Sequence, residues 1–540
     1  MRKKGFLPLL AILLFAFILR IYGINWDQGA HLHPDERMLI MVADRIHFFD
    51  NLSPDFFNYG SLPIYAIKAI SQAIDLFFPF LNLASYNGML YVGRYMSIFA
   101  DLTIIFIIFK TARLLFKEKQ EIAFFACFFY SISFFAIQNT HFFVVDVFLN
   151  LFIALTVYFL LLFIKKPCLK NITYMSIAFA AALAVKITAI IMFPVIVVAI
   201  IIKAARKYKN KKIFKALLYT ILFSSLSFLF FFIFMPYAIF NYNRFLNDIF
   251  SQIKMNSDPY IFPYTLQYVD TLPYFYYLKN IVIWGLGPII SCLSLIGIIY
   301  FAFNIKKLKN RGLILVYLIF YIFYLLIIGR SSVKFMRYML ILYPCLAIFA
   351  GYGIYYLKKK NMRIILYPIL FLSLLWTLMF VNIYSQKHTR IEASEWINNN
   401  IKHNKILAVE HWDDRLPIYE SEKYTILELR LYELPDDENK WKEINNVLDK
   451  ADYIIIASNR LYTPLQKLND CKKHIKCYPR TSTYYKLLFN EELGFKKQIE
   501  FSVYPKIKIG NFKLEIIDDN ADESFTVYDH PKIMIFKKSK

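Results

Sequence analysis

The chain has 540 residues, of which 58% are hydrophobic and 19% aromatic, and its mean hydropathy is +0.43. This composition is too apolar for a soluble globular protein and predicts a multi-pass membrane protein. The formal net charge of +24 would suit a nucleic-acid partner, but the Lys and Arg residues lie in short clusters between apolar runs. Because that distribution is typical of membrane topology, we expect no nucleic-acid partner.

The first apolar run, Phe6–Ile24, follows the basic residues 2–4. It is close to the ~20 residues that a helix needs to cross the hydrocarbon layer. The sequence therefore predicts a transmembrane helix with the N-terminus in the cytoplasm. A cleaved signal peptide is the alternative, but Arg20 interrupts the end of the run and no small-residue cleavage site follows it.

Residues 25–87 then form the first outer loop, which carries His31-Leu-His-Pro-Asp35-Glu36-Arg37. Pro34 and the acidic pair favour the first turn of a helix, where free N–H groups attract carboxylates. Capping of an interfacial helix is the simple interpretation of this pair. A pair of carboxylates at a membrane surface also suits acid–base chemistry.

Further apolar segments alternate in direction, because each basic flank is assigned to the cytoplasm. They are residues 88–109, 121–137, 142–164, 213–235, 281–303, 313–328, 338–357 and 364–384. The interrupted run 66–80 fits a helix lying along the interface. Segment 172–202 has basic clusters at both ends, so it must enter and leave the membrane as two short helices, with Lys186 at the outer turn. These assignments give about eleven transmembrane helices.

From residue 385 to residue 540 the composition is that of a soluble domain, which the topology places outside the cell. Residues 391–401 have helical spacing, and residues 405–410 and 451–458 read as strands. The alternation near the end of the chain predicts a terminal β-hairpin over 525–536. Cys471 and Cys477 are the pair that could form a disulfide in an oxidising compartment, and the sequence leaves that open.

The expected fold is thus a mainly α polytopic membrane protein with a membrane domain over 1–384 and an extracytoplasmic α/β domain over 385–540. Acidic and basic residues collect at the outer ends of the membrane helices. They are Asp35, Glu36, Arg94, Asp146, Lys186, Lys334 and Arg337. A carboxylate can act as a general base, and cations can stabilise a leaving phosphate, so this set fits transfer from a lipid phosphate.

An ordered series of motifs supports the same interpretation. The series is Ile18-Leu-Arg20-Ile-Tyr22, His33-Pro-Asp35-Glu36, Tyr59-Gly-Ser-Leu-Pro63, Val92-Gly93-Arg94, Asn139-Thr-His141-Phe-Phe-Val-Val-Asp146, Ala184-Val-Lys186-Ile-Thr188-Ala189, Lys334-Phe-Met-Arg337-Tyr338 and Tyr343-Pro344. In order and spacing it resembles the GT-C glycosyltransferases of the protein O-mannosyltransferase and aminoarabinose transferase type, which use polyprenyl-phosphate sugars.

The resemblance implies an inverting sugar transfer with Asp35 as the general base, Glu36 in support and Asp146 as a second acidic group. It also implies that Lys186, Arg337, Arg94 and Lys334 bind the donor phosphate. His33 and His141 could be metal ligands, but no metal or other cofactor is assigned. The Trp-Trp-Asp motif of oligosaccharyltransferases is missing from the sequence, which argues against transfer of an oligosaccharide to asparagine.

The implied partners are a polyprenyl-phosphate-linked sugar, the lipid bilayer, and a protein, lipid or polysaccharide acceptor on the outer face of the cytoplasmic membrane. Two alternatives remain open. One is a non-catalytic scaffold for envelope assembly. The other is a lipid or sugar transporter, which is disfavoured because the charges lie at the outer helix ends and no matching halves are found.

Overall fold

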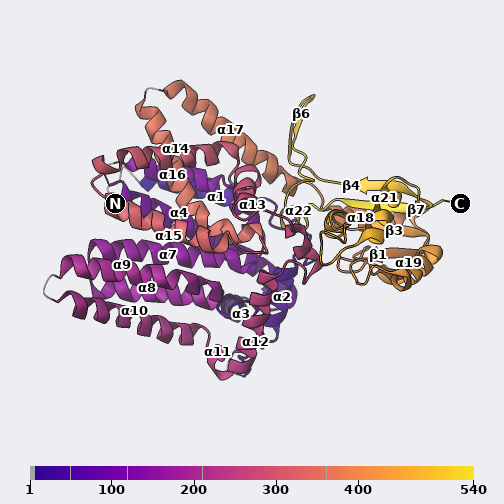
Figure 1. Ribbon diagram of the computed structural model, residues 1–540, viewed down its shortest axis with the longest axis horizontal. Coiled ribbons are helices and arrows are strands. Elements are labelled where there is room, and N and C mark those ends of the chain that lie inside the picture. The colour runs from indigo at the N-terminus through magenta and orange to yellow at the C-terminus, as the bar shows by residue number, and fades with distance from the viewer. Residues whose placement is uncertain (1–5, 49, 118, 209–210, 361, 540) are drawn as a thin grey trace. The chain divides into compact units, whose positions relative to one another are not determined.

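The chain divides into two compact units, which are described separately (Figure 1). The computed structural model describes residues 6–48, 50–117, 119–208, 211–360 and 362–539, so the basic residues 2–4 lie outside the described residues. The first unit, here the membrane unit, comprises Met1–Ile24, His33–Lys254 and Leu272–Leu378. The second unit comprises Asn25–Leu32, Met255–Thr271 and Met379–Lys540. The second unit therefore includes two earlier segments besides the C-terminal part of the chain.

The membrane unit is built from helices. They are α1 (Phe6–Ile21), α2 (Pro34–Asp44), α3 (Leu62–Phe77), α4 (Tyr86–Leu115), α5 (Gln120–Ser131), α6 (Phe134–Thr140), α7 (Val145–Lys165), α8 (Leu169–Val185), α9 (Phe193–Lys207), α10 (Lys212–Phe234), α11 (Tyr237–Phe240), α12 (Tyr242–Ser257), α13 (Phe275–Asn280), α14 (Pro288–Asn304), α15 (Arg311–Ile328), α16 (Tyr343–Lys359) and α17 (Arg363–Val381). Two 3₁₀ segments, η3 (Ile187–Met192) and η7 (Met336–Leu342), precede α9 and α16.

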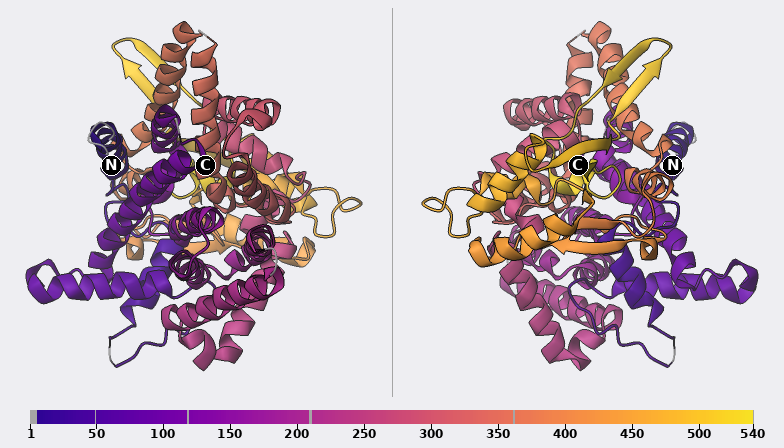
Figure 2. Two further views of the ribbon diagram at one scale, coloured as in Figure 1. Left: turned by 90° about the vertical axis from the view of Figure 1, so that its left-hand side faces the viewer. Right: turned by 90° about the vertical axis from the view of Figure 1, so that its right-hand side faces the viewer.

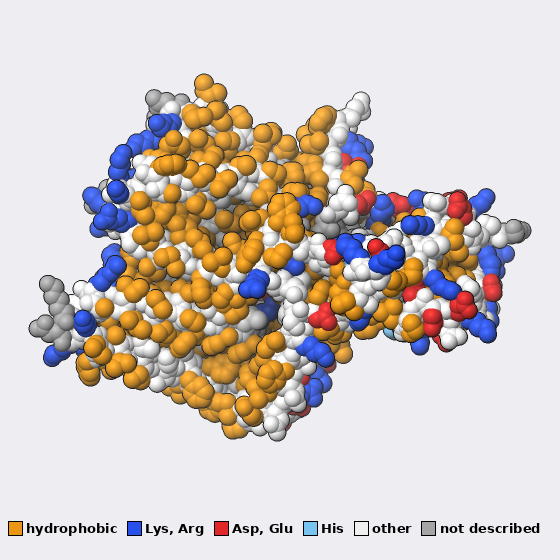
Figure 3. Space-filling view, viewed as in Figure 1, with side chains coloured by type: hydrophobic (Ala, Val, Ile, Leu, Met, Phe, Trp, Pro, Cys, Tyr) orange, Lys and Arg blue, Asp and Glu red, His pale blue; other side chains and the backbone are white. Residues whose placement is uncertain are grey.

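Within the described residues, seven helical segments are long and apolar enough to cross a membrane, or eight if the bent pair α5 and α6 is one span. Helices α1 and α8 are apolar but shorter. Hydrophobic side chains cover the visible face of this unit, and Lys and Arg gather at helix ends (Figure 3). The predicted multi-pass helical protein is therefore confirmed, while the count of about eleven spans stays a prediction.

The chain breaks at Lys186, between α8 and η3, inside the segment that the basic flanks divide into two helices. A second break separates α5 from α6, where the axis bends by 58°. Both breaks free backbone groups at helix ends, and such irregular backbone is tolerated in membrane proteins where protein or a polar cavity surrounds it.

A buried ion pair joins several helices in the interior of the membrane unit. Arg20 of α1 contacts Asp101 of α4 at 2.6 Å, and both side chains are at most 1% exposed. The Tyr130 hydroxyl donates to the other Asp101 oxygen at 2.7 Å, and the Asn150 amide donates to Tyr130 at 3.1 Å. Since an unpaired charge in this environment is costly, the network ties α1, α4, α5 and α7 together.

The second unit contains a five-stranded sheet in the order β2-β1-β3-β7-β4. Its strands are β1 (Ile406–Glu410), β2 (Thr425–Leu429), β3 (Tyr453–Ile456), β4 (Phe495–Phe501) and β7 (Ile533–Lys538). Strand β1 pairs in parallel with β2 and β3, whereas β7 is antiparallel to β3 and β4. The helices of this unit are α18 (Thr389–Asn400), α19 (Glu438–Lys450), α20 (Tyr462–Lys467), α21 (Pro479–Phe489) and α22 (Glu523–Thr526).

Separate hydrophobic clusters lie on the two faces of this sheet, as expected for an α/β layer structure. A two-stranded ribbon, β5 (Lys506–Ile509) and β6 (Phe512–Glu515), is not part of the sheet. Cys471 and Cys477 form a disulfide, which settles a question that the sequence left open.

The predicted terminal hairpin is wrong. Residues Glu523–Thr526 form the short helix α22, and of the two predicted strands only β7 exists. Phe525 and Val527 are both fully buried, so their alternation reflects burial in a compact turn and not a strand.

His530 lies between Asp518 and Asp529, with Nε2 at 3.0 Å from Asp518. Burial lowers the pKa of His530, but the two carboxylates outweigh it and raise that pKa to about 10.

Glu410, at the end of β1, is buried, and burial raises the pKa of its carboxyl to about 8. The Tyr485 hydroxyl donates to it. Because the folded state holds this proton up to about pH 8 while the unfolded carboxyl releases it near its ordinary pKa of 4.5, stability falls as the pH rises between these values. Glu410→Gln removes this pH dependence.

We therefore expect Glu410→Gln to raise the thermal unfolding midpoint at pH 8 relative to the unaltered chain, by less at pH 6 and by little at pH 5. The measurement is thermal unfolding of the detergent-purified full chain across this pH range. Glu422→Gln, at an exposed position of the same unit, is the matched control and should follow the unaltered chain. Parallel pH curves for Glu410→Gln and the unaltered chain would contradict the expectation.

Candidate functional site

Four charged side chains from separate elements of the membrane unit meet at one place. Asp35 lies in the first turn of α2 and Asp146 in the first turn of α7, where the positive end of a helix dipole favours carboxylates. Lys186 follows the last residue of α8, where the negative end of a dipole favours a cation. Arg337 comes from η7. Each of the three helix ends therefore favours the sign of charge that it carries.

Arg337 bridges the two carboxylates. Its Nη1 lies 3.1 Å from Asp35 Oδ2, and its Nε lies 3.6 Å from Asp146 Oδ2. Lys186 Nζ donates to Asp146 Oδ1 at 3.0 Å. Asp35 is the most accessible of the four at 23% exposure, while Lys186 and Arg337 are each 13% exposed and Asp146 is 4% exposed. We call these four residues the ion cluster; its two acids and two cations balance.

Aromatic rings support the two cations. Lys186 Nζ lies 4.5 Å from the centre of the Tyr338 ring, and the Arg337 guanidinium lies 4.5 Å from the centre of the Phe335 ring. Such cation–π contacts hold a cation in place while leaving its N–H groups available to oxygen ligands. Both rings come from the Lys334-Phe-Met-Arg337-Tyr338 motif. This one segment therefore provides Arg337 and the aromatic rings that contact both cations.

Tyr59 hydrogen-bonds the Asp35 carboxylate through its hydroxyl. Burial raises the pKa of Asp35, but Arg337, His33, Tyr59 and Lys186 outweigh that effect and leave the pKa below its usual value. Burial also raises the pKa of Tyr59, so its hydroxyl stays protonated and can donate. Asp35 is consequently an ionised carboxylate at neutral pH. Tyr59 belongs to the Tyr59-Gly-Ser-Leu-Pro63 motif, and the sequence alone assigns it no chemical role.

The turn that carries Tyr59 is fixed against the end of α8. The Gly60 amide donates to the Val185 carbonyl at 2.9 Å, one residue before Lys186. A Cβ atom on Gly60 would lie 1.9 Å from the Ala184 carbonyl oxygen, which is far inside van der Waals contact. Only glycine therefore allows this approach, and the approach ties the Tyr59 turn to the helix end that presents Lys186.

Glu36 and Arg94, both predicted site residues, form a separate buried pair. Arg94 donates from Nε and Nη2 to the two Glu36 oxygens at 3.0 and 2.8 Å, and both side chains are 0% exposed. The Phe143 amide donates to Glu36 at 2.8 Å, and Arg94 also donates to the Ile24 carbonyl at 2.8 Å. This pair therefore anchors α2 to α4 and to the segment before Asp146. In this arrangement it does not reach the surface as the ion cluster does.

Three other residues singled out in the sequence are bound to backbone groups. Lys334 is buried, and its Nζ donates to the Ser332 carbonyl at 3.0 Å. His33 caps α2 by accepting from the Glu36 amide. The His141 ring nitrogens lie 3.0 Å from the Ile137 carbonyl oxygen and 2.8 Å from the Tyr22 carbonyl oxygen. Across the residues that the structure describes, no group of three or more His, Cys, Asp or Glu side chains could hold a metal ion.

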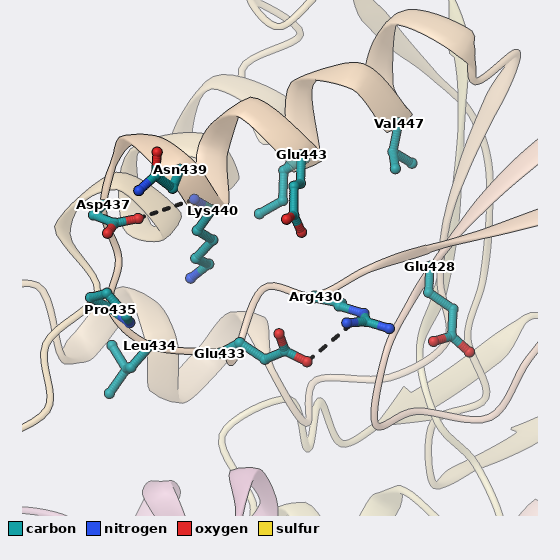
Figure 4. A pocket seen from close by; sticks show the side chains of 11 residues that line it. Glu428, Arg430, Glu433, Leu434, Pro435, Asp437, Asn439, Lys440, Glu443 and Val447 are labelled. Carbon is teal, nitrogen blue, oxygen red and sulfur yellow. Dashed lines mark hydrogen bonds and ion pairs between the residues drawn. The ribbon is translucent and has the colours of Figure 1, made fainter.

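The second unit has a hollow of about 460 Å³ between α19 and the loop after β2 (Figure 4). Glu433, Asp437 and Glu443 line it, and Arg430 lies 3.9 Å from Glu433. Lys440 also borders the hollow, but its Nζ is bound to Asp436 at 2.9 Å and to the Leu431 carbonyl at 2.8 Å. Because its cations already pair with neighbouring groups of the unit, we assign no ligand to this hollow.

Comparison with known proteins agrees with this fold. The family model described as dolichyl-phosphate-mannose-protein mannosyltransferase matches residues 85–238, which contain Arg94, Asp146 and Lys186. The oligosaccharyltransferase of Archaeoglobus fulgidus in the apo form is 11% identical with a TM-score of 0.52, and the match covers 93% of this chain and 74% of that chain. No curated protein sequence matches the chain.

ArnT from Cupriavidus metallidurans in the apo state is 12% identical with a TM-score of 0.49, over 86% of this chain and 95% of that chain. At such identities a likeness shows the fold alone, and the fold comparison here rests on the oligosaccharyltransferase. The family-model match over residues 85–238 and the fold of the oligosaccharyltransferase agree with the GT-C resemblance of the motif series.

The Gly60 contact gives a direct test of how the Tyr59 turn is held. Gly60→Ala forces a clash with the α8 backbone, and overpacking of this kind costs about 1–3 kcal/mol. We expect a lower thermal unfolding midpoint for the full chain in detergent. Gly312→Ala is the matched control, because a Cβ atom there meets nothing within 4 Å. If both variants unfold at the temperature of the unaltered chain, the Gly60 approach is not as tight as described.

Proposed function

We propose that this protein is a membrane glycosyltransferase that moves one sugar from a polyprenyl-phosphate donor to an acceptor on the extracytoplasmic face of the cytoplasmic membrane. The observation that carries the proposal is the ion cluster, in which Asp35 and the buried Asp146 meet the partly exposed Lys186 and Arg337. The GT-C fold and the matched mannosyltransferase family, whose description names a dolichyl-phosphate sugar donor, support this class of donor.

In the proposed reaction an acceptor hydroxyl attacks the anomeric carbon of the donor sugar. The bond from that carbon to the phosphate oxygen breaks, and polyprenyl phosphate leaves with both electrons of the bond. Asp35 accepts the proton of the attacking hydroxyl as a general base. Attack from the face opposite the phosphate inverts the anomeric centre.

Lys186 and Arg337 hold the donor phosphate and stabilise the negative charge that grows on it as the bond breaks. Arg presents a fork that fits two phosphate oxygens, and Lys gives a compact point charge. In the structure Lys186 contacts Asp146 and Arg337 contacts Asp35. A phosphate that shares Arg337 would weaken its hold on Asp35 and raise the pKa of that carboxylate. Donor binding would thus make Asp35 a stronger base.

Glu36 and Arg94 are proposed to act as positioning residues, because their mutual pairing buries both of them. Glu36 follows Asp35 in α2 and also accepts from the Phe143 amide, three residues before Asp146. The pair would therefore set the distance between the two acids of the ion cluster. Asp146 would keep Lys186 and Arg337 in place until the phosphate arrives.

Asp35→Asn keeps the shape of the side chain but removes the base, so we expect transfer to fall by roughly 10²-fold to 10⁴-fold. The measurement is mass analysis of envelope glycans and glycoproteins in cells that carry the chain, lack it, or carry the variant. Asp50→Asn, at an exposed position of the same outer loop, is the control and should retain transfer. Undiminished product in Asp35→Asn cells would reject Asp35 as the general base. Identical glycans in cells with and without the chain would favour a non-catalytic scaffold for envelope assembly.

Lys186→Gln removes one phosphate-binding cation. A charge-assisted hydrogen bond contributes about 1.5–3 kcal/mol, so we expect binding of polyprenyl monophosphate to weaken by about 10-fold to 100-fold. The measurement is titration of the purified protein with that lipid, followed by native mass spectrometry. Lys165→Gln, at the opposite end of α7 from Asp146, is the control. Equal affinities for the two variants would remove Lys186 from the proposed donor site.

A further inference from the structure

The ribbon of β5 and β6 has two chemically different faces. In its register Ile507 pairs with Leu514 and Ile509 with Phe512, whereas Lys506 pairs with Glu515 and Lys508 with Lys513. Because side chains alternate across a strand, the first two pairs share one face and the last two share the other. Sequence alternation therefore builds an apolar face and a charged face on one hairpin. The charged face has three lysines and Glu515, which pairs with Lys513 at 2.8 Å, so its net charge is positive.

The apolar face is strongly exposed. Ile509 is 71% exposed, Phe512 is 64% exposed and Leu514 is 41% exposed, and Ile517 just beyond the ribbon is 65% exposed. An isolated two-stranded hairpin is marginally stable in water. A ribbon with this much apolar surface needs an apolar medium or a protein surface to cover it. Figure 2 shows it as a yellow two-stranded arm.

The base of the ribbon is attached to the residues that follow α17. The Asn382 amide donates to the Lys506 carbonyl at 3.0 Å, and Lys506 Nζ donates to Gln386 at 2.7 Å. Asn382 comes directly after α17, whose apolar residues belong to a candidate membrane span. The ribbon therefore starts within hydrogen-bond distance of the residue that follows the long apolar helix α17.

The two faces of the ribbon suit a membrane interface. An apolar face can enter the acyl chains, while the long Lys side chains of the opposite face reach the lipid phosphates.

We propose that this ribbon is a membrane-interface anchor: its apolar face inserts into the acyl chains of the bilayer leaflet at the end of α17, and its lysines bind lipid phosphates. The anchor ties the second unit to the bilayer surface close to the exit of the last span. It is independent of the proposed sugar transfer, because none of its residues belongs to the ion cluster.

The test places one spin label on each face of the ribbon in the full chain, reconstituted in nanodiscs of phosphatidylcholine and phosphatidylglycerol. Cys168 and Cys292 are first replaced by Ser, while the buried Cys127 and Cys345 and the disulfide are kept. Ile509→Cys reports on the apolar face, and Lys508→Cys, its neighbour on the same strand, is the matched control. Phe512→Cys and Lys513→Cys repeat the comparison on the other strand if either variant of the first pair folds poorly.

We expect the label at position 509 to be relaxed more by oxygen, which concentrates in lipid, than by a water-soluble nickel chelate, with the reverse at position 508. Equal and high accessibility of both labels to nickel would show a ribbon in water and overturn the anchor. A label at 509 shielded from both reagents would show that protein covers the face, which also overturns insertion into lipid.

Discussion

The arrangement of the membrane unit depends on Arg337, which lies between two carboxylates and satisfies both with one guanidinium. Charges in a medium of low polarity are stable only when each has a partner. Asp35 and Asp146 come from helices far apart in the chain, and without a shared cation their repulsion would separate α2 from α7. Arg337 holds them together, and Lys186 completes the neutrality of the ion cluster. Three of the four charges, Asp35, Lys186 and Arg337, are partly exposed, so under the proposed function the donor phosphate would meet two cations that it takes over from their acids.

The buried pairs differ from the ion cluster in what they can do. Two pairs are buried away from the surface: Glu36 with Arg94, and Arg20 with Asp101. In each pair the two charged side chains contact each other directly. They fix the distances between helices. The ion cluster shares its cations between two acids and reaches the surface at Asp35, so its contacts can rearrange. Sealed pairs around an adjustable cluster are what a site needs if it must hold a charged substrate and then release a more highly charged product.

Much of the membrane unit was predictable, because the bilayer demands long apolar segments. Even the break at Lys186 follows from charges alone. The pairing of Glu36 with Arg94 was not predictable, since the sequence places both at the outer level without saying which charges face each other. Asp101 was missed because it lies inside an apolar helix, and its partner Arg20 comes from 81 residues earlier. The prediction of a terminal hairpin was wrong because alternating apolar residues occur in a fully buried turn as well as in a strand.

The separation between Arg20 and Asp101 has a consequence for biogenesis. The guanidinium of the first span is synthesised well before the carboxylate that neutralises it, so α1 on its own would carry an uncompensated cation into hydrocarbon. During synthesis α1 must therefore be held in a polar environment, by the insertion machinery or near the lipid headgroups, until α4 has entered. The ion pair therefore sets the order in which these helices assemble. Helix α1 takes its final place only after α4 is available, and the Tyr130 hydroxyl of α5 then donates to Asp101 of the completed pair.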